Sequence, residues 1–275
     1  MADFNEKTQV LIEALPYIKK YNEKIVVIKF GGNAMNEMEH LIEDIVLLKS
    51  IGMNPVVVHG GGPEVDAELK KLGITPKFIG GLRYTDENTM AIAEKVFNKI
   101  NDSIVDSIAY HGAKSMNANG YIKVKQKSKK LGLVGDITSI DKNKLLSFIA
   151  ADFIPVISPL GKDKDGEIYN INADTVASNI AVAVKAEKLT ILTDVDGVRL
   201  NGKIVPHLNF KTAKDAIKSG LINEGMIPKV EACMHAVRNK CPKAHLINGL
   251  TPHSLLLEIF TDEGVGTEIV NRGKV

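Results

Sequence analysis

Tryptophan is absent from this chain of 275 residues, cysteine occurs twice, and aromatic residues make up only 5%. Long apolar runs are missing as well, since none approaches the roughly 18 residues of a membrane span. The N-terminus does not join a basic stretch to an apolar one, so we expect no signal peptide. These absences argue against a membrane protein and predict a cytoplasmic one.

The two cysteines, Cys233 and Cys241, show neither CxxC spacing nor a clustering with histidines. Zinc sites of the common kinds carry such patterns, so the sequence predicts no zinc centre. We expect two free, buried thiols, as is usual in a reducing compartment.

A strong charge of one sign is also lacking, because 35 basic residues face 33 acidic ones for a net charge of +2. The densest basic stretch, 123–130, holds five lysines and no aromatic residue. We interpret it as a solvated hairpin rather than a nucleic-acid surface. Composition therefore favours neither a nucleic-acid partner nor a membrane, while 44% hydrophobic residues suffice for a sizeable core.

Short β-branched runs alternate with helical patterns along most of the chain. Strands are expected at 25–29, 55–59, 155–160, 189–193 and 245–247. Helices are expected at 37–51, 63–72, 86–110, 174–184, 219–240 (with a break at Gly225) and 254–260, and a hairpin at 120–138. This alternation predicts an α/β fold, a three-layer αβα sandwich around a mostly parallel open sheet.

An amphipathic helix is expected before the first strand, at 6–20, with Pro16 kinking it. Its apolar positions recur at helical spacing: Val10, Leu11, Leu15 and Ile18. An apolar stripe on such an appendage must be covered. Periodicity leaves open whether it packs on its own subunit or on a neighbour.

Glycines beside basic residues follow two of the expected strands. Lys29 precedes Gly31-Gly32, and His59 precedes Gly60-Gly61-Gly62; a third pattern, 225–229, opens a helical stretch. Ligands of open α/β sheets bind at the carboxyl ends of strands. Glycine there lets backbone N–H groups approach a phosphate, and a helix N-terminus adds a favourable dipole. The pattern predicts a phosphoryl-transfer site without a Walker loop.

Lys29 could neutralise negative charge on a transferring phosphoryl group. The alternative interpretation is that Lys29 is an ordinary surface lysine. We interpret His59 as structural, because a carboxylate acceptor is already ionised at neutral pH and needs no base. Arg83, after two glycines, suits a bidentate grip on a carboxylate, but loop arginines are often merely exposed.

Three short polar residues, Asn170, Asn172 and Asp174, alternate at an expected helix start. Asp174 could be an N-cap, or it could orient two catalytic lysines. The stretch 193–197 could face a nucleotide or form a plain Asx turn.

The ordered set of motifs resembles the acetylglutamate kinases of the amino-acid kinase superfamily, over about residues 26–270. The matching segments are 29–35 (Lys-Phe-Gly-Gly-Asn-Ala-Met), 58–62, 81–83 (Gly-Leu-Arg), 170–174, 192–198 and 225–229. Each alone is shared in part with carbamate, aspartate or uridylate kinases, whereas the whole set is specific.

The resemblance implies that Lys29 and Lys229 flank the transferring phosphoryl group and that Asp174 holds both. The implied acceptor-binding residues are Gly61, Gly62, Arg83, Asn170 and Asn172. The implied ATP-binding residues are Gly31, Gly32, Thr193, Asp196 and Met226. Mg²⁺ would be held chiefly by phosphates and water, so we name no protein ligand for a metal.

The implied reaction is ATP-dependent phosphorylation of the γ-carboxylate of N-acetyl-L-glutamate, a step of arginine synthesis. Residues 23–172 would form the acceptor lobe, 173–275 the ATP lobe, and 1–22 an oligomerisation helix. Acetylaminoadipate or carbamate remain alternative acceptors, because one methylene changes specificity only about ten- to two-hundred-fold. A non-catalytic arginine sensor is the other alternative, and the retained lysines and aspartate argue against it.

The N-terminal helix and the C-terminal segment resemble arginine-inhibited, hexameric members, in which extensions of neighbouring dimers interlace. L-arginine is then the implied effector, and the implied assembly is a homo-oligomer, a dimer or a hexamer built as a trimer of dimers. The implied effector site comprises Tyr17, His245, Glu258 and Gly264. Asn248-Gly249-Leu250 departs from the Asp-Gly-Arg usual in such members, which removes two charges that we expect at the edge of that site.

Overall fold

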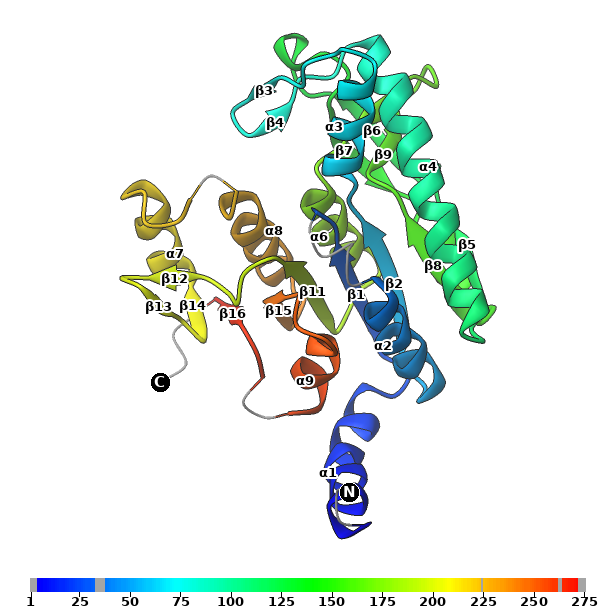
Figure 1. The fold of residues 1–275 in the computed structure, drawn as a ribbon, viewed down its shortest axis with the longest axis vertical. Coiled ribbons are helices and arrows are strands. Elements are labelled where there is room, and N and C mark those ends of the chain that lie inside the picture. The colour runs from blue at the N-terminus through cyan, green and yellow to red at the C-terminus, as the bar shows by residue number, and fades with distance from the viewer. Residues whose placement is uncertain (1–3, 33–37, 224, 262–263, 272–275) are drawn as a thin grey trace.

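The structure is a computed structural model that describes residues 4–32, 38–223, 225–261 and 264–271 (Figure 1). The last part of the first motif, residues 33–35, lies outside the described residues. No helix among the described residues is long and apolar enough to cross a membrane.

An eight-stranded sheet runs through the molecule in the order β14-β16-β15-β11-β1-β2-β8-β5. Every neighbouring pair is parallel except β15 and β16. In sheet order the strands are β14 (His207–Asn209), β16 (Thr267–Val270), β15 (Lys243–Asn248), β11 (Lys188–Thr193), β1 (Ile25–Phe30), β2 (Asn54–His59), β8 (Ile154–Ile157) and β5 (Ser115–Asn117). The predicted mostly parallel sheet is thus confirmed.

Helices cover both faces of this sheet, as the alternating directions of its side chains require. On one face Val27 of β1 joins a core with Val176 of α6 and Val230 of α8. On the other face Val26 joins a core with residues of α2, α4 and α9. The helices are α1 (Phe4–Tyr21), α2 (Met38–Ser50), α3 (Gly62–Lys71), α4 (Glu87–Tyr110), α5 (Lys142–Ala150), α6 (Ala173–Ala183), α7 (Phe210–Lys218), α8 (Ile227–Arg238) and α9 (Ser254–Phe260). The three-layer αβα prediction is therefore confirmed.

A smaller four-stranded sheet, in the order β10-β9-β6-β7, lies beside α3 and α4 (Figure 1). Its strands are β10 (Ile168–Asn170), β9 (Leu160–Lys162), β6 (Ile122–Gln126) and β7 (Gly135–Ile140). The predicted hairpin is the antiparallel pair β6–β7, with a short 3₁₀ helix, Lys129–Leu131, in its connection. Two small ribbons complete the fold: β3 (Phe78–Ile79) with β4 (Leu82–Arg83), and β12 (Arg199–Leu200) with β13 (Lys203–Ile204).

Two predicted elements are wrong in their extent. The helix expected over 219–240 occupies only 227–238, and residues 210–218 form α7, a helix that the sequence did not predict. Gly220 takes a left-handed φ of 73° just after α7, and Pro228 is the second residue of α8, so both helices are bounded by residues suited to their ends. The strand expected over 155–160 ends at Ile157, and a separate strand begins at Leu160.

Helix α1 projects from the remainder of the molecule (Figure 1). It is not interrupted at Pro16, which lies inside it. Val10, Leu11 and Leu15 are 64%, 72% and 46% exposed, so the subunit itself leaves these three residues of the apolar stripe uncovered, whereas Ile18 is half-buried. Tyr21, at the end of the helix, is buried with residues of α2 and α9.

Candidate active site

A cleft of about 240 Å³ opens where β1, β4, the loop after β2, and the beginnings of α6 and α8 meet. Its walls include the side chains of Lys29, Arg83, Asn170, Asp174 and Lys229. These residues come from four segments that are far apart in the sequence, since Asn170 and Asp174 belong to one of them, and the fold brings the four together.

Asp174 lies between two lysines. Its Oδ1 is 2.8 Å from Nζ of Lys29 and its Oδ2 is 3.7 Å from Nζ of Lys229. Asp174 and Lys29 are buried, whereas Lys229, in the first turn of α8, keeps 22% of its side chain exposed. Burial alone would raise the pKa of Asp174, but the two neighbouring ammonium groups lower it overall. The trio therefore carries a net positive charge at the wall of the cleft.

The helix start at Asn172 resolves the two interpretations of the polar triplet. Asn172, not Asp174, is the N-cap of α6, since its Oδ1 accepts a hydrogen bond from the backbone N–H of Thr175 at 3.0 Å. Asp174 is freed for the lysines. Asn170 donates from Nδ2 to Oγ1 of Thr85 at 3.2 Å, and both asparagines line the cleft.

The glycines after β1 and β2 have two kinds of role. Gly32, Gly60 and Gly62 line the cleft. Gly31 and Gly61 are not among its lining residues: a Cβ on Gly31 would lie 2.8 Å from Cα of Gly60, and one on Gly61 would lie 2.7 Å from Ile100. Their small size is therefore explained by close packing of the two loops and of α4.

Arg83 is held at the wall by several groups. Its Nη1 pairs with Oδ1 of Asp66 on α3, and its Nη2 donates to the carbonyl oxygen of Gly62 at 3.1 Å. The guanidinium also lies 4.9 Å from the ring centre of Phe78, which is part of the β3–β4 ribbon. A guanidinium has five N–H donors, so these bonds leave donors for a ligand.

His59 is wholly buried behind the glycine loop. Its Nδ1 is 2.7 Å from the carbonyl oxygen of Gly60 and its Nε2 is 3.0 Å from Oγ of Ser158, with Asn101 donating to that hydroxyl. Burial, with a contribution from Lys29, lowers the pKa of His59 to about 4. The neutral ring thus packs and positions the loop, in agreement with the structural interpretation.

Apart from Gly31 and Gly32, the residues expected to bind ATP lie in the C-terminal half of the chain. Thr193 is buried at the end of β11, and Met226 precedes α8. Asp196 is exposed; its Oδ2 pairs with Nη2 of Arg199 at 3.4 Å, and its Oδ1 accepts from Nδ2 of Asn248 at 2.8 Å. These three expected residues do not line the cleft around Lys29.

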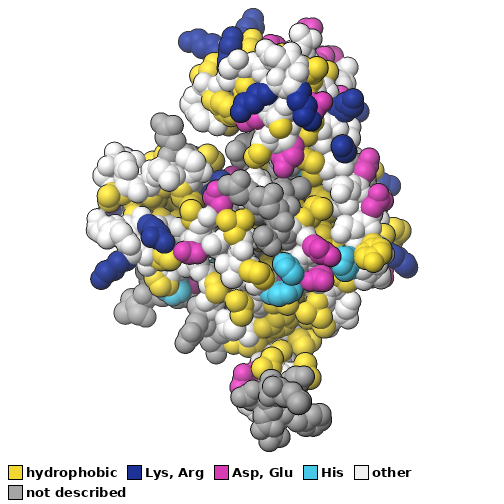
Figure 2. All heavy atoms as spheres, in the orientation of Figure 1, with side chains coloured by type: hydrophobic (Ala, Val, Ile, Leu, Met, Phe, Trp, Pro, Cys, Tyr) yellow, Lys and Arg dark blue, Asp and Glu magenta, His cyan; other side chains and the backbone are white. Residues whose placement is uncertain are grey.

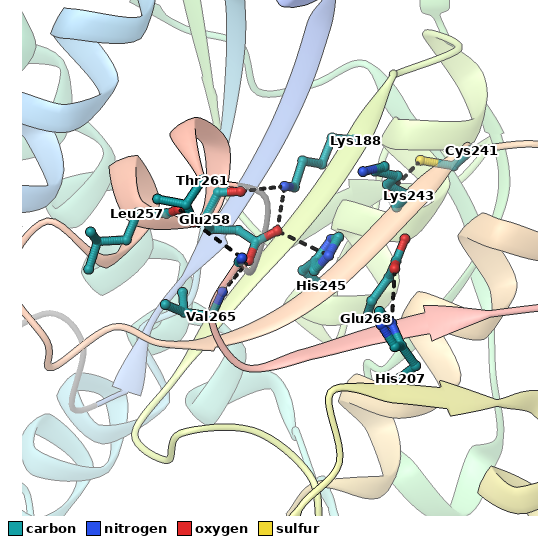
Figure 3. Close-up of polar contacts among 11 residues, drawn as sticks. Lys188, His207, Cys241, Lys243, His245, Leu257, Glu258, Thr261, Val265 and Glu268 are labelled. Atoms are coloured by element: carbon teal, nitrogen blue, oxygen red, sulfur yellow. Dashed lines mark hydrogen bonds and ion pairs between the residues drawn. The ribbon is translucent and has the colours of Figure 1, made fainter. Parts of the chain in front are cut away.

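A second cavity, of about 100 Å³, is lined by all four residues of the expected effector site: Tyr17, His245, Glu258 and Gly264. Figure 3 shows the carboxylate of Glu258 between Lys188 and His245, at 2.5 Å and 3.0 Å. Glu268 lies beside them and pairs with His207 at 3.1 Å. The cavity therefore contains two carboxylates among several basic groups.

Lys188 was not singled out from the sequence, although a lysine that begins a fully buried strand is a usable signal. Burial lowers its pKa, while Glu258 opposes that change. Asn248 and Leu250 are not among the residues that line this cavity, and Asn248 donates to Asp196 at the end of β15.

Comparison with known proteins places the chain in a family. Residues 24–248 match the sequence profile of the Amino acid kinase family, and the chain belongs to that family. It is 48% identical to the acetylglutamate kinase of Thermoanaerobacter pseudethanolicus, over 96% of this chain and 93% of that protein. It is 46% identical to the acetylglutamate kinase of Kosmotoga olearia, over 97% of this chain and 98% of that protein.

A solved structure shares the fold. It is the N-acetylglutamate synthase of Neisseria gonorrhoeae in complex with coenzyme A and N-acetylglutamate, with a TM-score of 0.89 and 24% identity. The match covers 97% of this chain and 64% of the synthase, so this chain spans less than two thirds of that protein. The same synthase has also been solved with coenzyme A and L-arginine, and its TM-score is then 0.85.

Proposed function

We propose that the chain transfers the γ-phosphoryl group of ATP to the γ-carboxylate of N-acetyl-L-glutamate, in arginine biosynthesis. The observation that carries this proposal is the trio of Lys29, Asp174 and Lys229 at the wall of a glycine-lined cleft. Membership of the kinase family and the acetylglutamate kinases that match it along nearly their whole length support the same reaction.

The chemistry needs positioning and positive charge rather than a base. An oxygen of the acceptor carboxylate forms a bond to the γ-phosphorus while the bond from that phosphorus to the bridging oxygen of ADP breaks. Negative charge on the transferred group is stabilised by the ammonium groups of Lys29 and Lys229. Asp174 holds both lysines, and because its own charge is balanced it does not repel the phosphates strongly.

The acceptor would lie on the side of the cleft formed by Arg83 and Asn170. Arg83 is already oriented by Asp66 and Gly62, so little freedom is lost when its remaining N–H groups bind the α-carboxylate. Asn170 would bond the acetamide. In this arrangement residues 23–172 form the acceptor lobe and residues 173–275 the ATP lobe, with Thr193, Asp196 and Met226 toward the nucleotide.

Mg²⁺ would accompany the ATP, where it neutralises phosphate charge. Asp174 is the one carboxylate among the described residues that line the cleft, and the two lysines occupy its oxygens. This donor set fits a metal held by phosphates and water rather than by a protein cage.

A test of the proposal is ADP release from ATP with a panel of acceptors: N-acetyl-L-glutamate, N-acetyl-L-aminoadipate, carbamate and L-glutamate, with a reaction lacking acceptor as the blank. We expect N-acetyl-L-glutamate to give the highest kcat/KM and a hydroxylamine-reactive acyl phosphate. A higher kcat/KM with another acceptor would replace the substrate, and no turnover with any acceptor would favour a non-catalytic sensor.

For regulation, we propose that L-arginine binds the cavity of Tyr17, His245, Glu258 and Gly264 and inhibits the enzyme. The carboxylates of Glu258 and Glu268 suit a guanidinium, and the related synthase fold has been solved with L-arginine. We further propose a hexamer, a trimer of dimers, in which the exposed stripe of α1 contacts a neighbouring dimer.

A further inference from the structure

Two histidines and a glutamate from distant parts of the sequence lie together on one face of the molecule. His40 and Glu43 lie on α2, one turn apart, and His253 lies directly before α9. One ligand-type atom of each residue lies within 4.8 Å of the corresponding atoms of the other two. Figure 2 shows histidine and acidic side chains close together on the face in front of α2. Packing of α2 against α9 produces this cluster, which is why sequence spacing predicted no zinc site.

Asp44 gives the cluster a second, independent feature. This carboxylate is 2% exposed, and its Oδ1 lies 2.6 Å from Nδ1 of His253. Burying a carboxylate costs free energy unless a partner pairs with it or donates a hydrogen bond to it. Histidines that bind metals commonly donate their other ring N–H to a carboxylate, which fixes the tautomer and the ring. With Nδ1 engaged in this way, Nε2 of His253 is the atom left for a ligand.

The backbone also holds His253 in place. Its φ is +57°, in the left-handed region, which histidine adopts more often than most residues other than glycine. The imidazoles of His40 and His253 are 5.0 Å apart and approach edge to face. The contact with Asp44 and the edge-to-face contact with His40 together fix the position of the His253 ring.

We propose that His40, Glu43 and His253 bind one Zn²⁺ ion, with Asp44 as a positioning residue for His253. Two imidazole nitrogens and one carboxylate oxygen form a donor set that suits Zn²⁺ and not Mg²⁺. Donors on one tetrahedral zinc lie roughly 3.3 Å apart. Nδ1 of His40 is already 3.4 Å from Oε2 of Glu43.

Asp44 holds His253 in place, so rotation of the His40 and Glu43 side chains would bring the donors together. His40, Glu43 and His253 keep 45%, 45% and 47% of their side chains exposed. Water would complete the tetrahedron. Since none of the three lines the phosphoryl-transfer cleft, the ion would act on stability, by joining α2 to the turn before α9.

The experiment titrates Zn²⁺ into the metal-free full chain, without nucleotide, against a chromophoric chelator. We expect one tightly bound ion per chain. His40→Gln and His253→Asn should each weaken binding more than tenfold, and asparagine tolerates the left-handed backbone. Asp44→Asn should weaken it roughly 10- to 100-fold. His111→Gln, which changes a histidine outside the cluster, is the matched control and should leave affinity unchanged.

Two further readouts separate a real site from a merely structural cluster. Co²⁺ should give a visible absorption band of tetrahedral type in the chain and in His111→Gln, but not in His40→Gln. Zn²⁺ should raise Tm in the same two proteins and not in His40→Gln. Absence of tight Zn²⁺ binding by the unaltered chain, or binding that both histidine variants keep in full, would overturn the proposal. Kinase turnover of the variants shows that they are folded.

Discussion

Lys229 is the more exposed of the two lysines that share Asp174, and its replacement probes the chemical step most directly. Lys229→Ala should lower kcat roughly 10²–10³-fold and leave the acceptor KM little changed, because the lost contact is to charge that develops during transfer. Steady-state kinetics with saturating ATP measure this. Lys218→Ala, an exposed lysine at the end of α7, is the control, and a normal kcat for Lys229→Ala would remove the residue from the mechanism.

His59 makes a pH-dependent contribution to stability. Its pKa is about 4 in the folded chain because of burial and the charge of Lys29, against about 6.5 when unfolded. Between pH 6.5 and about 4 the unfolded chain binds a proton at His59 and the folded chain does not. The free energy of unfolding is therefore highest above pH 6.5 and falls as the pH drops through this range. The shift corresponds to about 3 kcal/mol.

Urea unfolding between pH 7 and 4 checks this, with His59→Gln as the comparison. The variant should be less stable at pH 7 and should lose less stability in acid than the parent, because the other titrating groups are common to both. Parallel pH curves for the two proteins would show that His59 does not sense pH in the fold.

At the scale of elements, the β3–β4 ribbon and α3 hold Arg83 between Phe78 and Asp66. Arg83→Lys should raise the KM for N-acetyl-L-glutamate about tenfold or more, since a single ammonium cannot replace a bidentate fork. The KM for ATP and the thermal midpoint should change little. If the variant instead weakens ATP binding alone, the acceptor pocket has been placed on the wrong side of the cleft.

The elements that sequence predicted correctly are those with a buried core face. β1, β2 and β11 are buried on both faces and read as apolar runs, so their positions follow from composition alone. α7, which lies before the helix expected over 219–240, was not predicted, and the actual boundaries of α7 and α8 lie near Gly220 and Pro228. The two-residue strands β3 and β4 exist only through pairing with each other.

Part of the site was equally predictable. Lys29 and the glycines end strands, and parallel topology brings such ends to one edge, so their proximity follows from the pattern. The N-cap at Asn172 did not follow, because Asn172 and Asp174 are both good capping residues and only the helix start decides between them. Neither did the cluster of His40, Glu43 and His253, since contacts between distant helices leave no local spacing.

At the scale of the whole molecule, one sheet joins both halves of the chain: β1, β2, β8 and β5 come before residue 160 and the other four strands after it. Helix α1 stands outside this frame with Val10, Leu11 and Leu15 exposed. Tyr17, further along the same helix, lines the proposed arginine cavity. We therefore propose that assembly through α1 is coupled to occupation of that cavity.

Deleting residues 1–20 should leave dimers that turn over but no longer respond to arginine, because both the stripe and Tyr17 are removed. Light scattering and an arginine titration of activity measure the two effects. A truncated chain that stays hexameric, or that arginine still inhibits, would contradict the proposed assembly and control. So would a full-length chain that arginine never inhibits.

Leu11→Asp in the full-length chain separates the two contributions, because it places a charge in the 72% exposed centre of the stripe and keeps Tyr17. If arginine acts by favouring one ring geometry, the variant should be dimeric and insensitive to arginine, with its basal kcat retained. A dimeric variant that arginine still inhibits would locate the control within the subunit, at the cavity of Glu258 and His245, and would leave α1 an assembly device only.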